Sequence, residues 1–180
     1  KVQKLRSENG LPDLQFSRHL VFIGNPGTGK TTVARLIASI YHELGVLSKG
    51  QLVEVDRSGL VGAYVGHTAI KTQEVIQRAL GGVLFIDEAY TLIEGGSDTK
   101  DYGKEVINAL LTVLSEPNPD MIVILAGYED KMKKLLKSNP GLKDRFPLRF
   151  HFEDYTADEL SEIAHRILKS RNFVLTPEAN

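Results

Sequence analysis

The 180-residue sequence has no cysteine and no tryptophan, and its charges nearly cancel. Without cysteine it can form no disulfide, no Cys-ligated zinc site and no thiol nucleophile. The 22 basic and 23 acidic residues leave a net charge of -1, which disfavours nucleic acid as the main partner. The longest apolar run, residues 121–126, is far shorter than the ~20 residues of a membrane span. These absences predict a globular cytoplasmic protein without a membrane partner.

Strand-like and helix-like segments alternate along the chain. Short strands are expected at residues 19–23, 52–55, 83–86, 121–126 and 148–152, and those at residues 19–23 and 83–86 are expected to be buried. Apolar residues recur at helical spacing after the first strand and predict one buried helix face: Val33, Leu36, Ile37, Ile40, Tyr41 and Leu44. Strands that alternate with helices favour a parallel sheet covered on both faces. The predicted fold class is therefore three-layer α/β with a parallel five-stranded sheet.

The pattern changes after the last predicted strand. Thr156 and Glu159 fit a capping box that opens an amphipathic helix, and no strand follows it. Residues 176–178 are typical of a second helix start, although the sequence ends at Asn180. We therefore expect residues 1–153 to form an α/β domain and residues 154–180 to form the beginning of a truncated helical subdomain.

A glycine-rich segment between the first strand and its helix carries the strongest chemical signal. Residues 24–31 match the pattern G-x-x-x-x-G-K-[ST] in full. Its glycines let backbone N–H groups converge on a phosphate, to which the helix adds its positive end. Lys30 is expected to reach the β- and γ-phosphates, and the Thr31 hydroxyl to ligate Mg²⁺. The predicted nucleotide-binding residues are Asn25, Pro26, Gly27, Thr28, Gly29, Lys30, Thr31 and Thr32. The alternative, a tight turn with an incidental lysine, is disfavoured by the strand–loop–helix context.

An acidic pair follows the third predicted strand. Because ligands bind outside the carboxyl ends of parallel strands, Asp87 and Glu88 are expected beside the phosphate loop. Asp87 suits coordination of Mg²⁺, and Glu88 suits activation of an attacking water molecule. Such a pair is often only the solvated start of a loop, but the phosphate loop upstream favours the catalytic interpretation.

Together these motifs resemble those of AAA+ ATPases, with residues 24–31 as Walker A and residues 87–88 as Walker B. The resemblance narrows to the group of CbbX and stage V sporulation protein K over residues 60–69, 82–90, 124–128 and 138–145. It extends from about residue 16 to about residue 173. It implies a P-loop NTPase fold that binds ATP and Mg²⁺. It also implies a homo-oligomeric ring, usually a hexamer, that hydrolyses ATP and remodels a client protein.

The resemblance implies further roles for two segments. Tyr64, Val65 and Gly66 are similar to the aromatic–hydrophobic–glycine pore loop that grips a client chain; a buried tyrosine that anchors the loop is the alternative. Arg145 lies where the family has an arginine finger, which would complete a neighbouring subunit's site beside Lys30 and Glu88 as a catalytic residue. A surface arginine paired with Asp144 is the alternative.

At one position the chain departs from the family. AAA+ proteins usually carry a polar sensor residue at the tip of the fourth strand, where this chain offers Tyr128 or Glu129. The second sensor arginine of the family would lie beyond Asn180.

Three other functions compete with a protein-remodelling motor. A small-molecule kinase or a GTPase is disfavoured because no N-K-x-D motif occurs and Glu88 directly follows Asp87. A DNA-handling AAA+ member is disfavoured by the near-neutral charge. A regulatory module that binds nucleotide without turnover stays open.

Overall fold

The computed structural model describes residues 17–62, 64, 66–94, 102–116 and 119–173. Its five strands form one sheet in which every neighbouring pair is parallel. The strands are β1 (Leu20–Gly24), β2 (Leu52–Val55), β3 (Val83–Ile86), β4 (Ile122–Gly127) and β5 (Leu148–Phe152), in the order β2-β3-β4-β1-β5. The predicted five-stranded parallel sheet is therefore confirmed.

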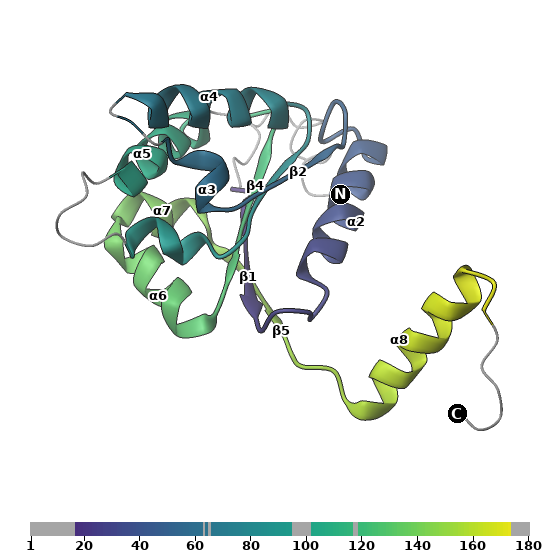
Figure 1. Ribbon diagram of the computed structural model, residues 1–180. Coiled ribbons are helices and arrows are strands. Elements are labelled where there is room, and N and C mark those ends of the chain that lie inside the picture. The colour runs from purple at the N-terminus through teal and green to yellow at the C-terminus, as the bar shows by residue number, and fades with distance from the viewer. Residues whose placement is uncertain (1–16, 63, 65, 95–101, 117–118, 174–180) are drawn as a thin grey trace, which may run out of the picture.

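Helices cover both faces of this sheet, as Figure 1 shows. One face carries α2 (Lys30–Glu43); the other carries α4 (His67–Ala79), α5 (Tyr102–Leu114), α6 (Glu129–Ser138) and α7 (Pro140–Arg145). Two short elements, α3 (Arg57–Leu60) and the 3-10 helix η1 (Ala89–Ile93), follow β2 and β3. The sequence analysis missed α3, η1 and α7, because elements of four to six residues are too short to display a helical period. Within the described ranges, no helix is long and apolar enough to cross a membrane.

Two apolar clusters join the sheet to its helix layers. The larger cluster lies between the sheet and α4 to α7, and the smaller one lies between the sheet and α2. In the smaller cluster, Phe22 and Phe85 meet edge to face with ring centroids 6.5 Å apart, and both are fully buried. Burial of such a side chain stabilises the fold by about 1.5–3 kcal/mol. The packed strands thereby hold their carboxyl ends together at one edge of the sheet.

The predicted buried face of α2 is only partly correct. Ala34 and Ala38 are fully buried against the sheet, whereas Leu36, Ile40 and Leu44 are 57%, 53% and 68% exposed. The small alanines allow the helix to lie close to the strands, which turns the larger side chains onto its flank. Periodicity detects an apolar stripe but does not reveal how wide the contact beneath it is. The molecule therefore carries an exposed apolar flank on α2.

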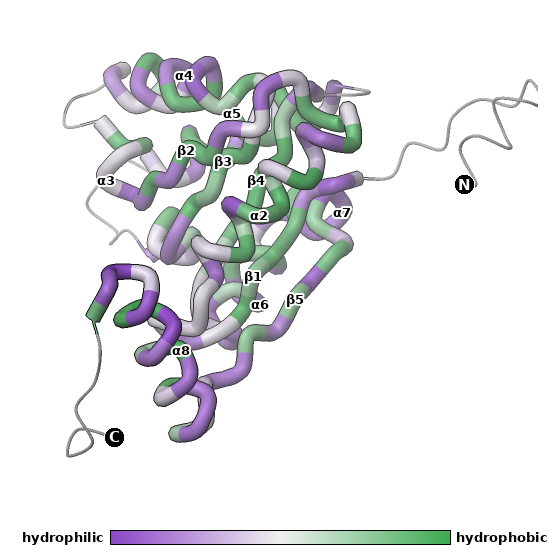
Figure 2. Tube along the Cα trace, turned by 90° about the vertical axis from the view of Figure 1, so that its right-hand side faces the viewer, coloured by the Kyte–Doolittle hydropathy of each residue, from purple (hydrophilic) through white to green (hydrophobic). Residues whose placement is uncertain are grey.

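The helix α8 (Ala157–Ser170) stands apart from the layered body in Figure 1. The predicted capping box at its start is confirmed. The Thr156 N–H donates to Glu159 Oε2 at 2.8 Å, and the Glu159 N–H donates to Thr156 Oγ1 at 3.3 Å. None of the residues of α8 is fully buried, and its Leu160 and Ile167 are 53% and 49% exposed. In Figure 2 the tube of α8 is mostly hydrophilic, with short hydrophobic stretches between. Residues 176–178, the second predicted helix start, lie outside the described residues.

A buried histidine precedes β1 and predicts a pH-dependent stability. His19 is 4% exposed, and its Nδ1 accepts a hydrogen bond from the Val123 N–H at 3.1 Å. Burial, followed by the charges of Arg145 and Arg18, lowers the pKa of His19 to about 4. The unfolded chain, with a histidine pKa of about 6.5, binds this proton at a higher pH than the native state. The contribution of His19 to the free energy of unfolding should therefore be complete above pH 6.5 and fall by about 3 kcal/mol as the pH drops to 4.

Urea unfolding at pH 7, 5.5 and 4.5 measures this loss. The variant His19→Gln keeps a hydrogen-bond acceptor for Val123 but does not titrate, so its stability should depend less on pH. The exposed His165 on α8 provides the matched control, since His165→Gln should retain the wild-type pH dependence. An equal slope in the wild type and His19→Gln would contradict the assignment.

Candidate functional site

The loop after β1 curls because two of its glycines adopt a left-handed backbone. Gly27 has φ 79° and Gly29 has φ 85°, values that side-chain-bearing residues rarely adopt. The Thr28 hydroxyl closes the curl by donating to the Asn25 carbonyl oxygen at 2.8 Å. The helix α2 then begins without a side-chain cap and without an acidic residue in its first turn. Its first N–H groups and the positive end of its dipole therefore remain available to an anion.

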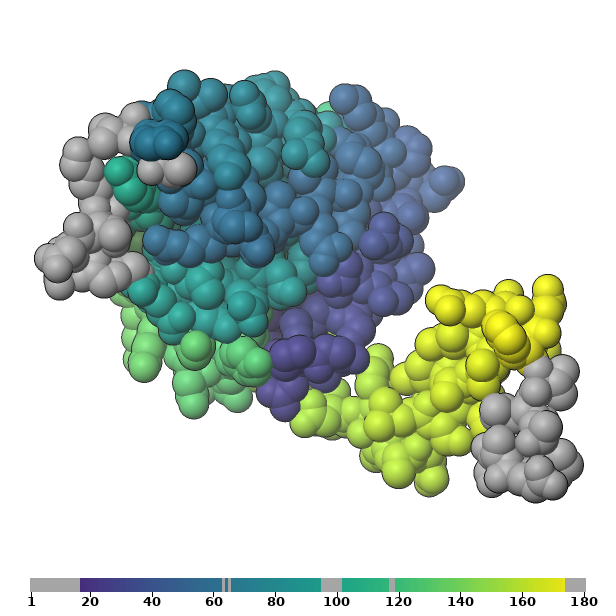
Figure 3. Space-filling view, in the orientation of Figure 1, coloured from purple at the N-terminus to yellow at the C-terminus, as the bar shows by residue number. Residues whose placement is uncertain are grey.

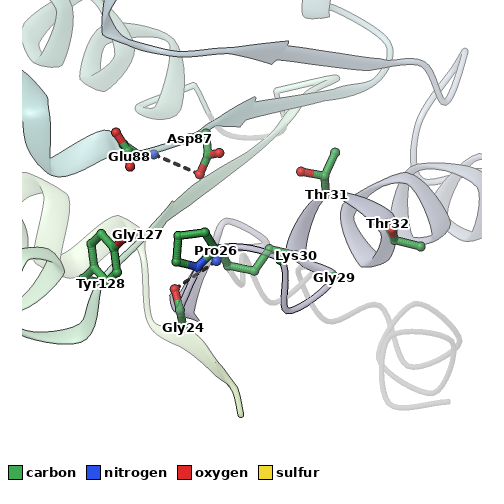
Figure 4. Close-up of a pocket in the computed structure, with 11 residues that line it drawn as sticks. Gly24, Pro26, Gly29, Lys30, Thr31, Thr32, Asp87, Glu88, Gly127 and Tyr128 are labelled. Carbon is green, nitrogen blue, oxygen red and sulfur yellow. Dashed lines mark hydrogen bonds between the residues drawn. The ribbon is translucent and has the colours of Figure 1, made fainter. Parts of the chain in front are cut away.

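Lys30 lies inside this curl rather than on the surface. Its residue is 8% exposed, and its Nζ donates to the carbonyl oxygens of Gly24 at 2.9 Å and Asn25 at 2.6 Å. Figure 4 shows the side chain folded toward Gly24. Burial lowers the pKa of Lys30, while the charges of Asp87, Asp154 and Glu88 oppose that shift. The Lys30 amine thus lies among backbone carbonyl oxygens, and the negative charges of nearby carboxylates act on it.

The acidic pair leaves β3 through a strained turn. Glu88 has φ 45° and ψ 41°, a left-handed backbone that costs a non-glycine residue about 1–3 kcal/mol. Three hydrogen bonds stabilise it: Asp87 Oδ1 accepts from the Glu88 N–H at 3.0 Å, and the Glu88 carbonyl accepts from the N–H and the hydroxyl of Thr91 at 2.9 and 2.7 Å. The turn brings both carboxylates to the side of the cavity that faces the phosphate loop, as Figure 4 shows.

These elements enclose a cavity of about 340 Å³ at the carboxyl edge of the sheet. Of the predicted nucleotide-binding residues, six line it: Pro26, Gly27, Gly29, Lys30, Thr31 and Thr32. Asp87 and Glu88 line it from the end of β3, and Gly127 and Tyr128 from the end of β4. The side chains of Asn25 and Thr28 do not line the cavity. The Asn25 side chain donates a hydrogen bond to Asp154, and the Thr28 hydroxyl donates one to the backbone of the loop. Residues far apart in the sequence thus meet at one cavity.

Two oxygen donors in the cavity fit Mg²⁺. Thr31 supplies a hydroxyl and Asp87 a carboxylate, and both line the cavity. Oxygen ligands of this kind, completed by phosphate oxygens and water, are those that Mg²⁺ prefers. The Thr31 hydroxyl donates its proton to Glu54 Oε1 at 3.4 Å, which leaves its oxygen able to coordinate a cation. When bound, Mg²⁺ would neutralise negative charge on the phosphates.

The structure distinguishes the two candidates at the tip of β4. Tyr128 lines the cavity, whereas Glu129 is paired with Lys133 at 2.8 Å at the start of α6. Behind Tyr128 lies the buried Tyr90, whose ring centroid is 5.9 Å from that of Tyr128. Burial, followed by the charge of Glu88, raises the pKa of Tyr90 to about 12. The sequence analysis missed Tyr90, for which adjacency to the acidic pair was the only available signal.

Arg145 lies away from this cavity. It ends α7, just before β5, at the amino edge of the parallel sheet, whereas the phosphate loop lies at the carboxyl edge. Its guanidinium donates to Ser115 Oγ at 2.8 Å, and its carbonyl oxygen accepts from the Ser17 hydroxyl. Among the ion pairs of the described residues, none joins Arg145 to Asp144. The surface pair weighed as an alternative is thus not formed.

Tyr64 is 70% exposed in the segment before α4, so the alternative of a buried anchor is wrong. Its ring meets that of His67 edge to face, with centroids 5.5 Å apart. Gly66, with φ 81°, is the N-cap residue of α4. Val65, the middle residue of the predicted pore loop, lies outside the described residues.

The cavity, the parallel sheet and the strand order together define a nucleotide-binding α/β domain. A model of the ATPase family associated with various cellular activities (AAA) matches residues 20–154, and the chain belongs to this family. Stage V sporulation protein K of Bacillus subtilis (strain 168) is 49% identical to it over 178 residues, 99% of this chain and 55% of that protein. Protein CbbX of Cereibacter sphaeroides is also 49% identical over 178 residues, 99% of this chain and 57% of that protein.

A chloroplastic ribulose bisphosphate carboxylase/oxygenase activase of Cyanidioschyzon merolae is 47% identical over 99% of this chain and 60% of its own length. The chain thus spans little more than half the length of these relatives, and the predicted resemblance to the CbbX and sporulation protein K group is confirmed. The solved AAA domain of FIGL-1 in complex with ADP superposes with a TM-score of 0.60 at 20% identity, over 86% of this chain and 49% of that one. This likeness confirms the fold.

Proposed function

We propose that this chain binds ATP with Mg²⁺, hydrolyses it, and acts in a ring that remodels a client protein. The observation that carries the proposal is the meeting of Lys30, Thr31, Asp87 and Glu88 around one cavity. The uncapped start of α2 and the Lys30 amine suit the β- and γ-phosphates, while Thr31 and Asp87 suit the metal ion.

In this proposal Glu88 is the general base. It accepts a proton from a water molecule whose oxygen bonds to the γ-phosphorus, and the bond from that phosphorus to the oxygen of ADP breaks. Tyr128, which lines the cavity, replaces the usual polar sensor residue.

ATP turnover without an added acceptor tests the reaction class. We expect the chain to release phosphate from ATP in the presence of Mg²⁺, with no acceptor molecule and no stimulation by DNA. Product formation only with a small-molecule acceptor would instead indicate a kinase. Binding without any turnover, in an assembled ring, would indicate a regulatory module.

Exposed apolar surface supports assembly with further copies. Besides the flank of α2, the edge strand β5 exposes Leu148 and Phe150 by 43% and 49%. Apolar surface of this kind favours contact with another protein. The five residues of β5 span about 16 Å, so Arg145, three residues before this strand, is remote from the phosphate loop of its own chain. Its proposed target is therefore the γ-phosphate in a neighbouring copy of a ring of six.

Mixing of two inactive variants tests this role of Arg145. Arg145→Ala should lower turnover by about 10³-fold or more and Glu88→Gln by about 10²–10⁴-fold, because each removes a catalytic group. In an equal random mixture, about a quarter of the head-to-tail interfaces should combine an intact Glu88 with an intact Arg145. Turnover should recover accordingly when the two are mixed, measured as phosphate release. A mixture as inactive as its components would exclude action between subunits.

The exposed Tyr64 is the proposed contact with the client. An aromatic ring in a glycine-bearing loop can grip a polypeptide through sequence-independent contact. The relatives are named for different processes, sporulation and activation of ribulose bisphosphate carboxylase/oxygenase, so we assign a protein client without naming it.

A further inference from the structure

A side-chain pair joins the phosphate loop to the segment that leads into α8. Asn25 Nδ2 donates to both carboxylate oxygens of Asp154, at 3.0 and 2.8 Å. Asp154 lies two residues after β5 and three residues before α8. Hydrogen bonds to an ionised acceptor are roughly twice as strong as neutral ones, so this pair can hold two segments that are remote in sequence.

The next residue makes a second link to the same loop. The Tyr155 hydroxyl donates to the Thr28 carbonyl oxygen at 3.3 Å. A Cβ atom on Gly29 would lie only 2.8 Å from that hydroxyl oxygen, so the bare backbone of Gly29 admits the tyrosine. Two consecutive side chains of the connecting segment thus contact three residues of the phosphate loop.

These links lie outside the cavity but connect to its lysine. Asp154 and Tyr155 do not line the cavity, whereas Lys30 does. The Asn25 carbonyl oxygen accepts from Lys30 Nζ at 2.6 Å, while the Asn25 side chain holds Asp154. A movement of Lys30 toward a bound phosphate would release that carbonyl and change the conformation of the residue that holds Asp154.

The helix beyond these links has little else to orient it among the described residues. None of its residues is fully buried, and Figure 3 shows it extending away from the body from the point where the connecting segment meets the phosphate loop. We propose that Asp154 and Tyr155 are positioning residues that tie α8 to the phosphate loop, so that the conformation of the loop sets the direction of α8. The response to nucleotide rests on the proposed function, whereas the tie itself does not.

The absence of cysteine makes a direct distance measurement possible. Cysteines introduced at the exposed positions Glu43 of α2 and Lys169 of α8 accept two spin labels at defined sites. Pulsed electron paramagnetic resonance then reports the distribution of distances between α2 and α8. We expect one narrow distribution in the otherwise unaltered chain, and a shift of its mean on addition of ADP with Mg²⁺.

Three variants separate the tie from a general loss of structure. Asp154→Ala should replace the narrow distribution by a broad one, because the acceptor of Asn25 is lost. Asp154→Asn retains one carbonyl acceptor for Asn25 and should stay narrow, which also shows that charge alone is not responsible. Asp158→Ala removes a nearby exposed acid in the first turn of α8 and should likewise stay narrow.

An exchange of the two partners provides a rescue. Asn25→Asp alone places two carboxylates face to face and should broaden the distribution, whereas Asn25→Asp combined with Asp154→Asn restores a donor and an acceptor and should narrow it again. Tyr155→Phe removes only the bond to Thr28 and should broaden the distribution less than Asp154→Ala.

A distribution as narrow in Asp154→Ala as in the parent chain would overturn the tie. Titration with a fluorescent ADP analogue reports binding separately, so a chain that fails to bind it would refute the proposed function while the nucleotide-free comparison still decides the tie. Binding of ADP without any shift of the distance would overturn the coupling of α8 to the phosphate loop.

Discussion

Replacement of Lys30 by alanine is expected to abolish nucleotide binding at cellular concentrations. The amine lies in the curl of the phosphate loop, where it would form charge-assisted hydrogen bonds with phosphate oxygens. Each such bond contributes about 1.5–3 kcal/mol, so loss of two corresponds to an affinity about 10²–10⁴-fold lower. Titration with a fluorescent ATP analogue measures this change.

Two further variants test whether the loss of binding in Lys30→Ala is due to the charge of this lysine. Lys30→Met keeps most of the aliphatic stem but no charge, so it should lose binding to the same extent while preserving the packing of the loop. Lys133→Ala removes an exposed lysine that pairs with Glu129 on α6, and it should bind as the parent chain does. Unchanged affinity in Lys30→Met, with an unchanged melting temperature, would refute the phosphate site.

Replacement of Glu88 by glutamine is expected to separate binding from hydrolysis. The amide has the shape of the carboxylate but cannot accept the proton of the attacking water. General base catalysis contributes about 10²–10⁴-fold, and phosphate release at saturating ATP should fall by that factor. Affinity for ATP should stay within about twofold, because Glu88 is not among the groups proposed to hold the phosphates.

The surface acid Glu162 supplies the matched control. It is paired with Arg166 on α8 at 2.7 Å and is remote from the cavity lining, so Glu162→Gln should hydrolyse ATP at the parent rate. Turnover at the parent rate in Glu88→Gln would exclude Glu88 as the base and leave its strained backbone without a catalytic explanation.

Much of the fold could be predicted because its signals are local. Strands buried on both faces of a parallel sheet appear as short apolar runs, and β3 was predicted with its observed bounds, residues 83–86. The capping box at Thr156 is likewise written in four consecutive residues. Where a property depends on the neighbours of a side chain, prediction was weaker: the flank of α2 that carries Leu36 and Ile40 was expected to be buried and is exposed.

The candidate site, too, could be predicted from the sequence only where its signals are local. The phosphate loop and the acidic pair are contiguous motifs, and their meeting followed from the rule that parallel strands present their carboxyl ends together. The left-handed backbone of Glu88 was not predictable, because it depends on the turn into η1 and the bonds from Thr91. The choice of Tyr128 over Glu129 was also open until the pairing of Glu129 with Lys133 was seen.

The amino-acid sequence by itself determined the motifs of this protein: a phosphate loop, an acidic pair after a buried strand, and the segments by which its family is recognised over nearly the whole chain. Only the tertiary structure decided how distant parts act on one another. It placed Arg145 at the edge of the sheet opposite the phosphate loop, and Asp154 against Asn25 across 129 residues of sequence. The physical reason is that motifs are encoded by consecutive residues, whereas these placements depend on the strand order, which sets β1 between β4 and β5 and brings the end of β5 beside the loop that follows β1.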